Sequence, residues 1–251
     1  MSAKYISSIL FDNDLCRRSY LNDLPVVKYL ADNSQLSFSS DVTFFVGENG
    51  TGKSTLLEAI AVAYGFNAEG GTRNFSFSTN DTHSELHKSI TLVKRAYAKD
   101  GFFLRAESLY NLATNIDDMD KGPGFGLPII HSYGGVSLHN QSHGESFLSI
   151  VQNRFSGNGL YILDEPESAL SPMRLLTLMV EIHELVKRGS QFIIATHSPM
   201  LITFPGADVL EFSQNGIQKV NYKDTEHYQI TKRFLENPEK MLHYLLQDDD
   251  V

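Results

Sequence analysis

A glycine-rich loop between an apolar segment and a periodic segment constrains this chain more than any other feature of its sequence. Residues 47–54 read Gly-Glu-Asn-Gly-Thr-Gly-Lys-Ser and fit the phosphate-loop pattern G-x-x-x-x-G-K-[ST] at every defined position. The apolar run 42–46 precedes the loop, and residues 56–63 repeat apolar side chains at helical spacing. The sequence therefore predicts a strand, a loop and a helix that together hold a nucleoside triphosphate.

Each defined position of this loop has a chemical reason. Backbone N–H groups of the loop and of the helix N-terminus point at phosphate oxygens. Lys53 neutralises the β- and γ-phosphates, and the Ser54 hydroxyl is a ligand for Mg²⁺. The residues predicted to contact the nucleotide here are Gly47, Glu48, Asn49, Gly50, Thr51, Gly52, Lys53, Ser54 and Thr55.

Composition excludes several classes of protein. With 251 residues, 41% of them hydrophobic, the chain is long enough to bury a large core. A net charge of −9 argues against a surface that is basic throughout, although it leaves room for a local basic groove. The apolar runs are too short to cross a bilayer, the first residues lack the layout of a secretory signal, and the single Cys16 argues against disulfides. We therefore expect a cytoplasmic protein with no transmembrane segment.

The pattern of elements predicts an α/β fold. In the first half we expect strands at 4–10 and 42–46, a helix at 54–64, a hairpin of strands 90–98 and 102–106, and a helix at 146–155. In the second half we expect strands at 159–163, 192–195, 209–212 and 217–220. We also expect a helix from Ser171-Pro172 to Val186 and a further helix opened by Ser198-Pro199. C-terminal helices should cover 225–246, with a break at Asn237-Pro238. Strands that alternate with helices imply a largely parallel sheet covered on both faces, with the site at the carboxyl ends of the strands.

Two adjacent carboxylates follow the apolar strand 159–163. In phosphate-loop enzymes an acid at such a strand end holds Mg²⁺ or its waters, which suits Asp164. Glu165 is then placed to orient or deprotonate an attacking water, because successive side chains leave a strand end in different directions.

Three segments resemble motifs of the ABC-type ATPases. Residues 164–171, Asp-Glu-Pro-Glu-Ser-Ala-Leu-Ser, resemble the Walker B motif and D-loop of that family. Residues 193–199, Ile-Ile-Ala-Thr-His-Ser-Pro, resemble its switch segment, with His197 standing 33 residues after Asp164. Residues 141–145, Gln-Ser-His-Gly-Glu, resemble the signature, whose form in the SMC and RecF-like branch is Leu-Ser-Gly-Gly-Glu. Gln141 replaces the leucine and His143 the first glycine.

The resemblance implies a fold and a domain organisation. It implies a P-loop NTPase of ABC type, with a largely parallel central sheet flanked by helices, a small antiparallel strand subdomain and a short helical signature lobe. The single domain 1–251 would divide into lobe I at about 1–66 and 156–224, the signature lobe at about 67–155 and C-terminal helices at about 225–251. Only 89 residues separate Lys53 from Ser142, so we expect no long coiled coil there, and we expect no appended nuclease domain.

The resemblance also implies a shared active site. Lys53, Glu165 and His197 would be the catalytic residues, and Ser54 and Asp164 would hold Mg²⁺ beside ATP. Ser142 and Gly144 of a second copy would close on the γ-phosphate, which gives a head-to-tail homodimer in the ATP-bound state. Ser168 and Ser171 would couple the two sites.

Two parts of the family pattern leave alternatives open. The Q-loop glutamine is missing, and Glu107 or Ser108, after the strand 102–106, could reach Mg²⁺ or the water instead; the solvated end of a strand is the other reading of Glu107. For the adenine, Tyr20 and Arg73 could stack on the ring or touch phosphates, or they could be ordinary surface residues.

The leading functional hypothesis is an ATPase that acts as a switch or motor in a DNA-repair or defence-type assembly, with DNA or a protein as a possible partner. The nucleotide-binding subunit of a transporter is the first alternative, although the missing glutamine and the signature glutamate argue against it. The second is a module that binds ATP without hydrolysing it. A nucleotide kinase is a weaker alternative, because it would need neither the signature nor His197.

Overall fold

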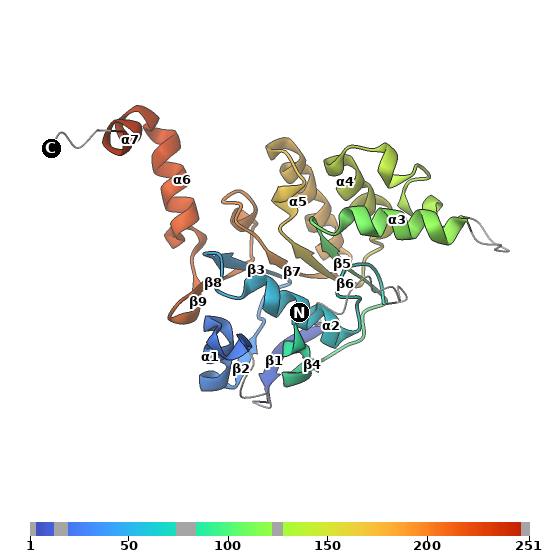
Figure 1. Cartoon of the computed structure of the whole chain (residues 1–251), viewed down its shortest axis with the longest axis horizontal. Coiled ribbons are helices and arrows are strands. Elements are labelled where there is room, and N and C mark those ends of the chain that lie inside the picture. The colour runs from blue at the N-terminus through green and yellow to red at the C-terminus, as the bar shows by residue number, and fades with distance from the viewer. Residues whose placement is uncertain (1–3, 13–19, 74–83, 122–127, 247–251) are drawn as a thin grey trace.

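A six-stranded sheet runs through the molecule in the order β5-β6-β7-β3-β8-β9. The computed structural model describes residues 4–12, 20–73, 84–121 and 128–246 (Figure 1). The strands of this sheet are β3 (Val42–Gly47), β5 (Asp100–Arg105), β6 (Gly159–Asp164), β7 (Gln191–Ala195), β8 (Asp208–Ser213) and β9 (Gly216–Val220). All neighbouring pairs are parallel except β8 and β9, which form an antiparallel hairpin. The expected largely parallel sheet is confirmed.

Side chains of the central strands alternate between two hydrophobic cores. Phe45, Ile162 and Ile193 belong to the core on one face of the sheet, whereas their neighbours Phe44 and Leu163 belong to the core on the other. This alternation follows from the two-residue period of a strand. Because both faces are apolar, the sheet needs covering layers on both sides.

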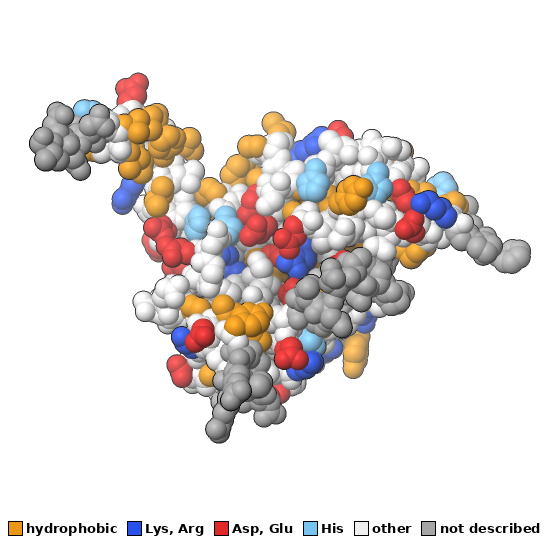
Figure 2. All heavy atoms as spheres, viewed as in Figure 1, with side chains coloured by type: hydrophobic (Ala, Val, Ile, Leu, Met, Phe, Trp, Pro, Cys, Tyr) orange, Lys and Arg blue, Asp and Glu red, His pale blue; other side chains and the backbone are white. Residues whose placement is uncertain are grey.

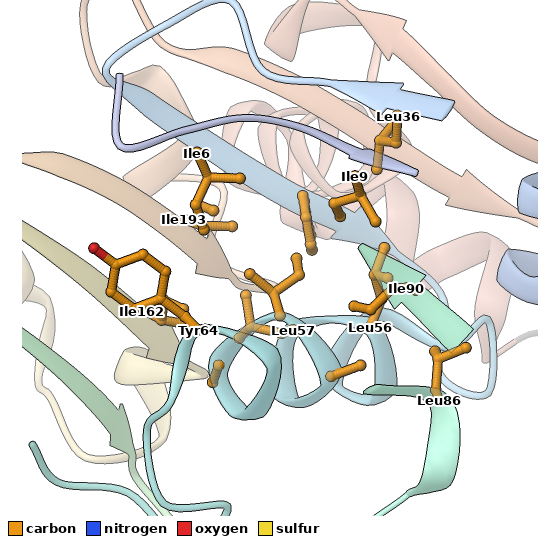
Figure 3. Packing of buried hydrophobic residues seen from close by; sticks show 14 of the residues in the cluster. Ile6, Ile9, Leu36, Leu56, Leu57, Tyr64, Leu86, Ile90, Ile162 and Ile193 are labelled. Atoms are coloured by element: carbon orange, nitrogen blue, oxygen red, sulfur yellow. The ribbon is translucent and has the colours of Figure 1, made fainter. Parts of the chain in front are cut away.

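The first core lies between the sheet, helix α2 (Lys53–Tyr64) and a small second sheet. That sheet has the order β2-β1-β4, is antiparallel, and comprises β1 (Ile6–Phe11), β2 (Gln35–Ser37) and β4 (Ile90–Lys94). Figure 3 shows Leu56 and Leu57 of α2 close to Ile193 of β7 and to Ile6 and Ile9 of β1. The expected small antiparallel subdomain is confirmed, and it holds α2 against the main sheet. Helix α1 (Pro25–Asn33) also packs into this core.

The second core lies between the opposite face of the sheet and a group of helices. These are α3 (Leu109–Asp120), α4 (His143–Arg154) and α5 (Pro172–Lys187), which lie together on one side in Figure 1. Short 3-10 helices connect the main elements at Tyr20–Asp23, Glu85–Ser89, Ile129–Tyr133, Leu138–Asn140, Pro166–Ser168, Leu201–Thr203 and Tyr222–Asp224.

The expected hairpin over 90–106 is wrong. β4 pairs with β1 in the small sheet, whereas β5 pairs in parallel with β6 in the large one. The burial of the two strands explains the difference: β4 is only partly buried, whereas β5 is buried from Asp100 to Leu104 and so needs cover on both faces. Residues 95–99 therefore connect two sheets.

The expected α-helix after Ser198-Pro199 is also wrong. The chain makes only the single 3-10 turn Leu201–Thr203 there, in which the Ser198 hydroxyl accepts a hydrogen bond from the N–H of Leu201. Phe204 is extended because it precedes Pro205, and a residue before proline disfavours the helical conformation.

The C-terminal helices project from the rest of the fold. They are α6 (Glu226–Glu236) and α7 (Pro238–Leu245), and the expected break at Asn237-Pro238 is confirmed. Neither helix contains a buried residue, and Figure 1 shows both extending away from the sheet. No helix in the described ranges combines the length and the apolar character needed to span a bilayer.

The division into lobes stays a prediction. The strands β4 and β5 fall inside the expected signature lobe of 67–155, yet they pair with strands outside that range. Cys16 and the glycine-rich segment 122–126 lie outside the described residues.

A buried acid ties the start of β5 to the end of α4. The Asp100 carboxylate accepts hydrogen bonds from the Tyr161 hydroxyl at 2.8 Å and from the N–H and hydroxyl of Ser156, each at 3.0 Å. It also pairs with Arg154 at 2.9 Å. Burial acts to raise the pKa of Asp100, but these hydrogen bonds and the arginine outweigh it and hold the pKa below its usual value.

We expect Asp100→Asn to lower the free energy of unfolding at pH 7 by about 2 kcal/mol, because the amide loses the charge-assisted contacts. A lowered carboxyl pKa contributes stability that is present above the ordinary pKa and is lost as the pH falls through the folded value. The difference in the free energy of unfolding between the wild type and the variant should therefore become smaller in acid. Urea unfolding at pH 7 and at about pH 3 measures both effects. Tyr161→Phe, which removes one hydrogen bond, should lower the free energy of unfolding by about 1 kcal/mol. If the stability of Asp100→Asn fell between pH 7 and acid by as much as that of the wild type, the proposed role of the Asp100 charge would be wrong.

Candidate functional site

The glycine-rich loop lies at the carboxyl end of β3, and its backbone conformation explains the glycines. Gly47 has a φ of +127°, and a Cβ there would lie 2.0 Å from the carbonyl oxygen of Phe212 on β8. Gly50 has a φ of +80°, but no atom lies within 4 Å of the place where its Cβ would be. Gly47 is therefore required by the sheet, whereas the open side of Gly50 leaves the loop backbone accessible to a ligand.

Lys53 is folded back over the loop. Its Nζ donates hydrogen bonds to the carbonyl oxygens of Gly47 and Glu48, both at 2.7 Å, and only 5% of the residue is exposed. Burial lowers the pKa of Lys53, and the nearby carboxylates of Glu165 and Asp164 oppose that shift. The ammonium group is held by two carbonyl oxygens at the start of the loop. A cavity of about 140 Å³ beside it is lined by the loop and helix residues Asn49, Gly50, Gly52, Lys53, Ser54 and Thr55, together with Leu24 and Glu165.

Asp164 lies at the end of β6, against the start of α2. Its Oδ1 accepts a hydrogen bond from the Ser54 hydroxyl at 3.1 Å, and its Oδ2 lies 3.4 Å from Nε of Arg105. Burial raises the pKa of Asp164 to about 6, against the opposing effects of Arg105 and Ser54. A second cavity, of about 290 Å³, opens here and is lined by Ser54, Arg105, Ala106, Glu107, His143, Asp164, Glu165 and Ser168.

The oxygens at this place fit Mg²⁺. A serine hydroxyl and a carboxylate, in contact and facing one cavity, are hard oxygen donors, and Mg²⁺ commonly takes one or two protein ligands while phosphates and waters complete its shell. Within the described ranges no cluster of three or more His, Cys, Asp or Glu side chains could hold a metal ion alone. Ser54 and Asp164 would therefore hold the ion together with a phosphate.

Arg105 is a site residue that the sequence reasoning missed. It stands opposite Asp164 in the β5–β6 pairing and pairs with Glu58 of α2 at 2.7 Å and with Glu107 at 2.5 Å. Glu107 lines the cavity near Ser54 but is 73% exposed at its side chain. Its role as a metal ligand stays a prediction. An arginine near the end of the apolar strand predicted at 102–106 was the available signal for Arg105.

Glu165 is held in an unusual conformation directly after Asp164. Its φ is +49°, a left-handed value that is uncommon for a residue other than glycine, and its N–H donates to the carbonyl oxygen of Ala195 at 2.9 Å. Its carboxylate lines both cavities, lies 3.6 Å from Nε2 of His197 and accepts a hydrogen bond from Ser168 at 3.4 Å. Strained backbone of this kind tends to occur at functional sites, because the surrounding structure must enforce it.

His197 follows β7 and is fixed through its backbone. The Glu167 carboxylate accepts hydrogen bonds from the His197 N–H and, at 2.7 Å, from the Thr196 hydroxyl. Burial and the nearby Lys53 lower the pKa of His197, while Glu165 opposes them. The imidazole is therefore neutral at pH 7. The carboxyl ends of β3, β6 and β7 thus bring together Lys53, Ser54, Asp164, Glu165 and His197, as the sequence predicted.

The signature residues lie at the start of α4. Ser142 caps this helix in a capping box with Glu145, and Arg174 of α5 pairs with Glu145 at 2.9 Å and donates to the Ser142 hydroxyl at 3.1 Å. A Cβ on Gly144 would lie 2.8 Å from the carbonyl oxygen of Ala169, so packing within the chain already requires this glycine. Ser142 and Gly144 do not line the two cavities described above, whereas His143 lines the larger one.

The two candidates for adenine contact are placed differently. Tyr20 is 66% exposed. Arg73 donates to the carbonyl oxygen of Ala98 at 3.1 Å and lies over the ring of Tyr64. Neither lines the two cavities, and their role at a nucleotide stays a prediction.

The space-filling view shows how side chains of each type are distributed over one face of the molecule. In the space-filling view, acidic and histidine side chains gather near the middle of the face that is turned to the reader (Figure 2). Hydrophobic side chains mark the projecting C-terminal helices in the same view.

Two families match separate parts of the chain. Residues 25–118 match a family described as "AAA domain", and residues 131–203 match one described as "AAA domain, putative AbiEii toxin, Type IV TA system". Among curated proteins, the ribose import ATP-binding protein RbsA of Bacillus cereus is 25% identical over 192 residues. That similarity covers 70% of this chain but 38% of the relative, so the chain spans less than two fifths of the length of this relative.

Solved structures with a similar arrangement include cbiO1 of Clostridium perfringens, part of the ABC transporter complex cbiONQ. It is 16% identical, with a TM-score of 0.48 over 96% of this chain and 99% of that one. The SMC head domain of Thermotoga maritima is 15% identical, with a TM-score of 0.44 over 87% of this chain and 99% of that one.

The two domain matches cover both halves of the site: the first contains Lys53 and Ser54, and the second contains Asp164, Glu165 and His197. Residues 25–118 and 131–203 are therefore each similar to AAA domains, and Lys53, Asp164 and His197 follow one another along the chain in the order of the motifs described above.

Proposed function

We propose that this chain binds ATP with Mg²⁺ and hydrolyses it, and that two copies associate head-to-tail around two ATP molecules. The observation that supports this best is the convergence of Lys53, the Ser54–Asp164 pair and Glu165 on adjoining cavities at one edge of the sheet. Phosphoryl transfer depends mainly on positioning and charge neutralisation, and these groups supply both.

Lys53 is the group that receives the phosphates. Its ammonium already has two carbonyl acceptors in the loop, and its three N–H donors allow it to turn toward β- and γ-phosphate oxygens. Loop amides near Gly50 contact the same phosphates from the open side. Ser54 and Asp164 would hold Mg²⁺, which when bound would supply charge neutralisation at the phosphate oxygens.

Glu165 is the group that positions water. Its carboxylate lies between the loop cavity and the Ser54–Asp164 cavity, and 42% of the side chain is exposed, so water can reach it. His197, 3.6 Å away, is the neighbouring polar group that would contact the γ-phosphate. Orientation of the attacking water by an acceptor is the contribution expected of such a carboxylate.

The dimer is proposed because one chain supplies only part of the site. Ser142 is exposed at a helix N-terminus, a place that favours anions, and it does not line the cavities at Lys53 and Asp164 of its own chain. In the proposed dimer, Ser142 and Gly144 of one copy close on the γ-phosphate held by the other. Ser168, beside Glu165, and Ser171 would then lie at the interface and couple the two sites.

For the biological setting we propose a switch or motor in a DNA-repair or defence-type assembly. The family description for residues 131–203, which names a putative toxin of a type IV toxin–antitoxin system, supports the defence reading. The transporter alternative is favoured by the import protein RbsA, which is similar over 70% of this chain. Stimulation of turnover by duplex DNA would support the first reading, and stimulation that requires a membrane partner would support the second.

Glu165→Gln should lower the ATPase rate by about a hundredfold, because the amide keeps the shape but is a poor proton acceptor. ATP should still bind, so the variant should accumulate as an ATP-bound dimer, which light scattering after size exclusion measures. Glu184→Gln, on the exposed face of α5, is the matched control and should hydrolyse ATP normally. Normal turnover by the Glu165 variant would show that this carboxylate is not the water-orienting group.

Mixing two inactive variants tests the shared site. Lys53→Ala removes the phosphate contact, and Ser142→Asn keeps an oxygen for the helix cap while enlarging the signature side chain. In a mixed dimer one of the two sites is intact, so mixing should restore a fraction of the activity, at most about a quarter. Each variant alone should stay inactive. A mixture as inactive as its components, while dimers still form, would contradict the head-to-tail arrangement.

A further inference from the structure

A second histidine from a distant segment contacts His197. His227 lies in the first turn of α6, and its Nε2 is 3.2 Å from Nδ1 of His197. The two rings meet edge to face, with 5.2 Å between their centroids. On its other side, His197 presents Nε2 to the Glu165 carboxylate at 3.6 Å. The three side chains therefore form a row from the carboxylate to the start of α6.

A single proton lies between the two rings, and its position fixes what His197 can do. If Nδ1 of His197 carries the proton, then its Nε2 is bare and directs a lone pair at the Glu165 carboxylate, which is repulsive. In the other arrangement, Nε2 of His227 carries the proton and donates a hydrogen bond to Nδ1 of His197. The N–H of the neutral His197 is then on its Nε2, where it can donate to an anion. The neighbouring carboxylate selects the second arrangement.

The choice of tautomer matters because His197 is neutral. Burial and Lys53 lower its pKa, and the charged or titratable groups that act on it are Lys53, Glu165 and His227. A neutral imidazole has one N–H, so it can donate toward a phosphate only if that proton is on the correct nitrogen.

The fold holds His227 in place. Thr225, the residue at the N-cap position of α6, is fully buried, and its hydroxyl donates to the carbonyl oxygen of Tyr222 at 2.7 Å. Tyr228 meets the ring of Tyr222 edge to face and packs against the second core. His227 also borders a cavity of about 450 Å³ whose lining includes Gly47 and Glu48 of the phosphate loop. The first turn of α6 is thus fixed beside the site, although the rest of the helix projects.

We propose that His227 is a positioning residue for this site: it donates its Nε2–H to Nδ1 of His197, fixes the ring and keeps the His197 proton on Nε2, directed at Glu165 and the γ-phosphate. This inference rests on the proposed ATPase function. His227 lies outside the loop, the two adjacent acids, the signature and the switch segment. At metal sites, the partners that fix the tautomer of a histidine matter nearly as much as the histidine, and we apply the same reasoning to His197.

Two substitutions of His227 distinguish a role in hydrogen-bond donation from a role in packing. His227→Leu removes the donor, whereas His227→Gln offers an amide N–H for the same contact. We expect the leucine variant to lose about tenfold or more in kcat, with ATP affinity nearly unchanged, and the glutamine variant to stay within about threefold of wild type. His243→Leu on α7 is the matched control and should leave kcat unchanged. Thermal unfolding of all variants checks that the fold is retained.

The tautomer is read directly in the protein without nucleotide. Nitrogen-15 NMR of histidine-labelled protein, with the His197 signals assigned by their loss in His197→Gln, should show only the Nε2–H form in the wild type and in His227→Gln. The leucine variant should show a mixture of the two forms. A wild-type spectrum with the proton on Nδ1, or a glutamine variant as slow as the leucine variant, would overturn the inference. If the wild type hydrolyses no ATP, the proposed function fails, while this spectrum still decides the tautomer.

Discussion

The parallel pairing of β3, β6 and β7, buried on both faces, is the constraint on which the rest of the structure depends. Phe45 lies opposite Ala195, and Asp164 lies opposite both Ala195 and Arg105, so these strands end level with one another. A slip of one residue would exchange the two hydrophobic cores and is therefore strongly opposed. The same packing that fixes the register thus fixes the relative positions of the loop, the two adjacent acids and His197.

The site contains charged groups of both signs without nucleotide, and its acids outnumber its cations. Three acids, Asp164, Glu165 and Glu167, surround a region whose cations are Lys53 and Arg105. Burial raises the pKa of both Asp164 and Glu167. Such groups favour the approach of added positive charge. A nucleotide that arrives with Mg²⁺ brings cation and anion together, which suits a site that already contains both signs.

Local patterns in the sequence predicted most residues of the site. The features that were missed depend on contacts between segments that are far apart in the chain. The loop, the strand ending in Asp164-Glu165 and the segment around His197 are each recognisable within a few consecutive residues. The hairpin over 90–106 was wrong because nothing local distinguishes a strand that turns back on its neighbour from one that moves to another sheet. Arg105 and His227 were missed for the same reason: their importance depends on Asp164 and His197, which are 59 and 30 residues away in the chain. The left-handed φ of Glu165 is also invisible in the sequence, because no local residue pattern marks it.

The projecting helix α6 has a mechanical consequence. It is about 16 Å long, from 11 residues at 1.5 Å each, and it contains no buried residue, yet its first turn contacts His197. An element held at one end and free along its length acts as a lever, so a tilt of about 10° at His227 would move its far end by about 3 Å. Displacements at the site that are too small to expose or cover a side chain would therefore become visible as movement of α7, well away from the sheet.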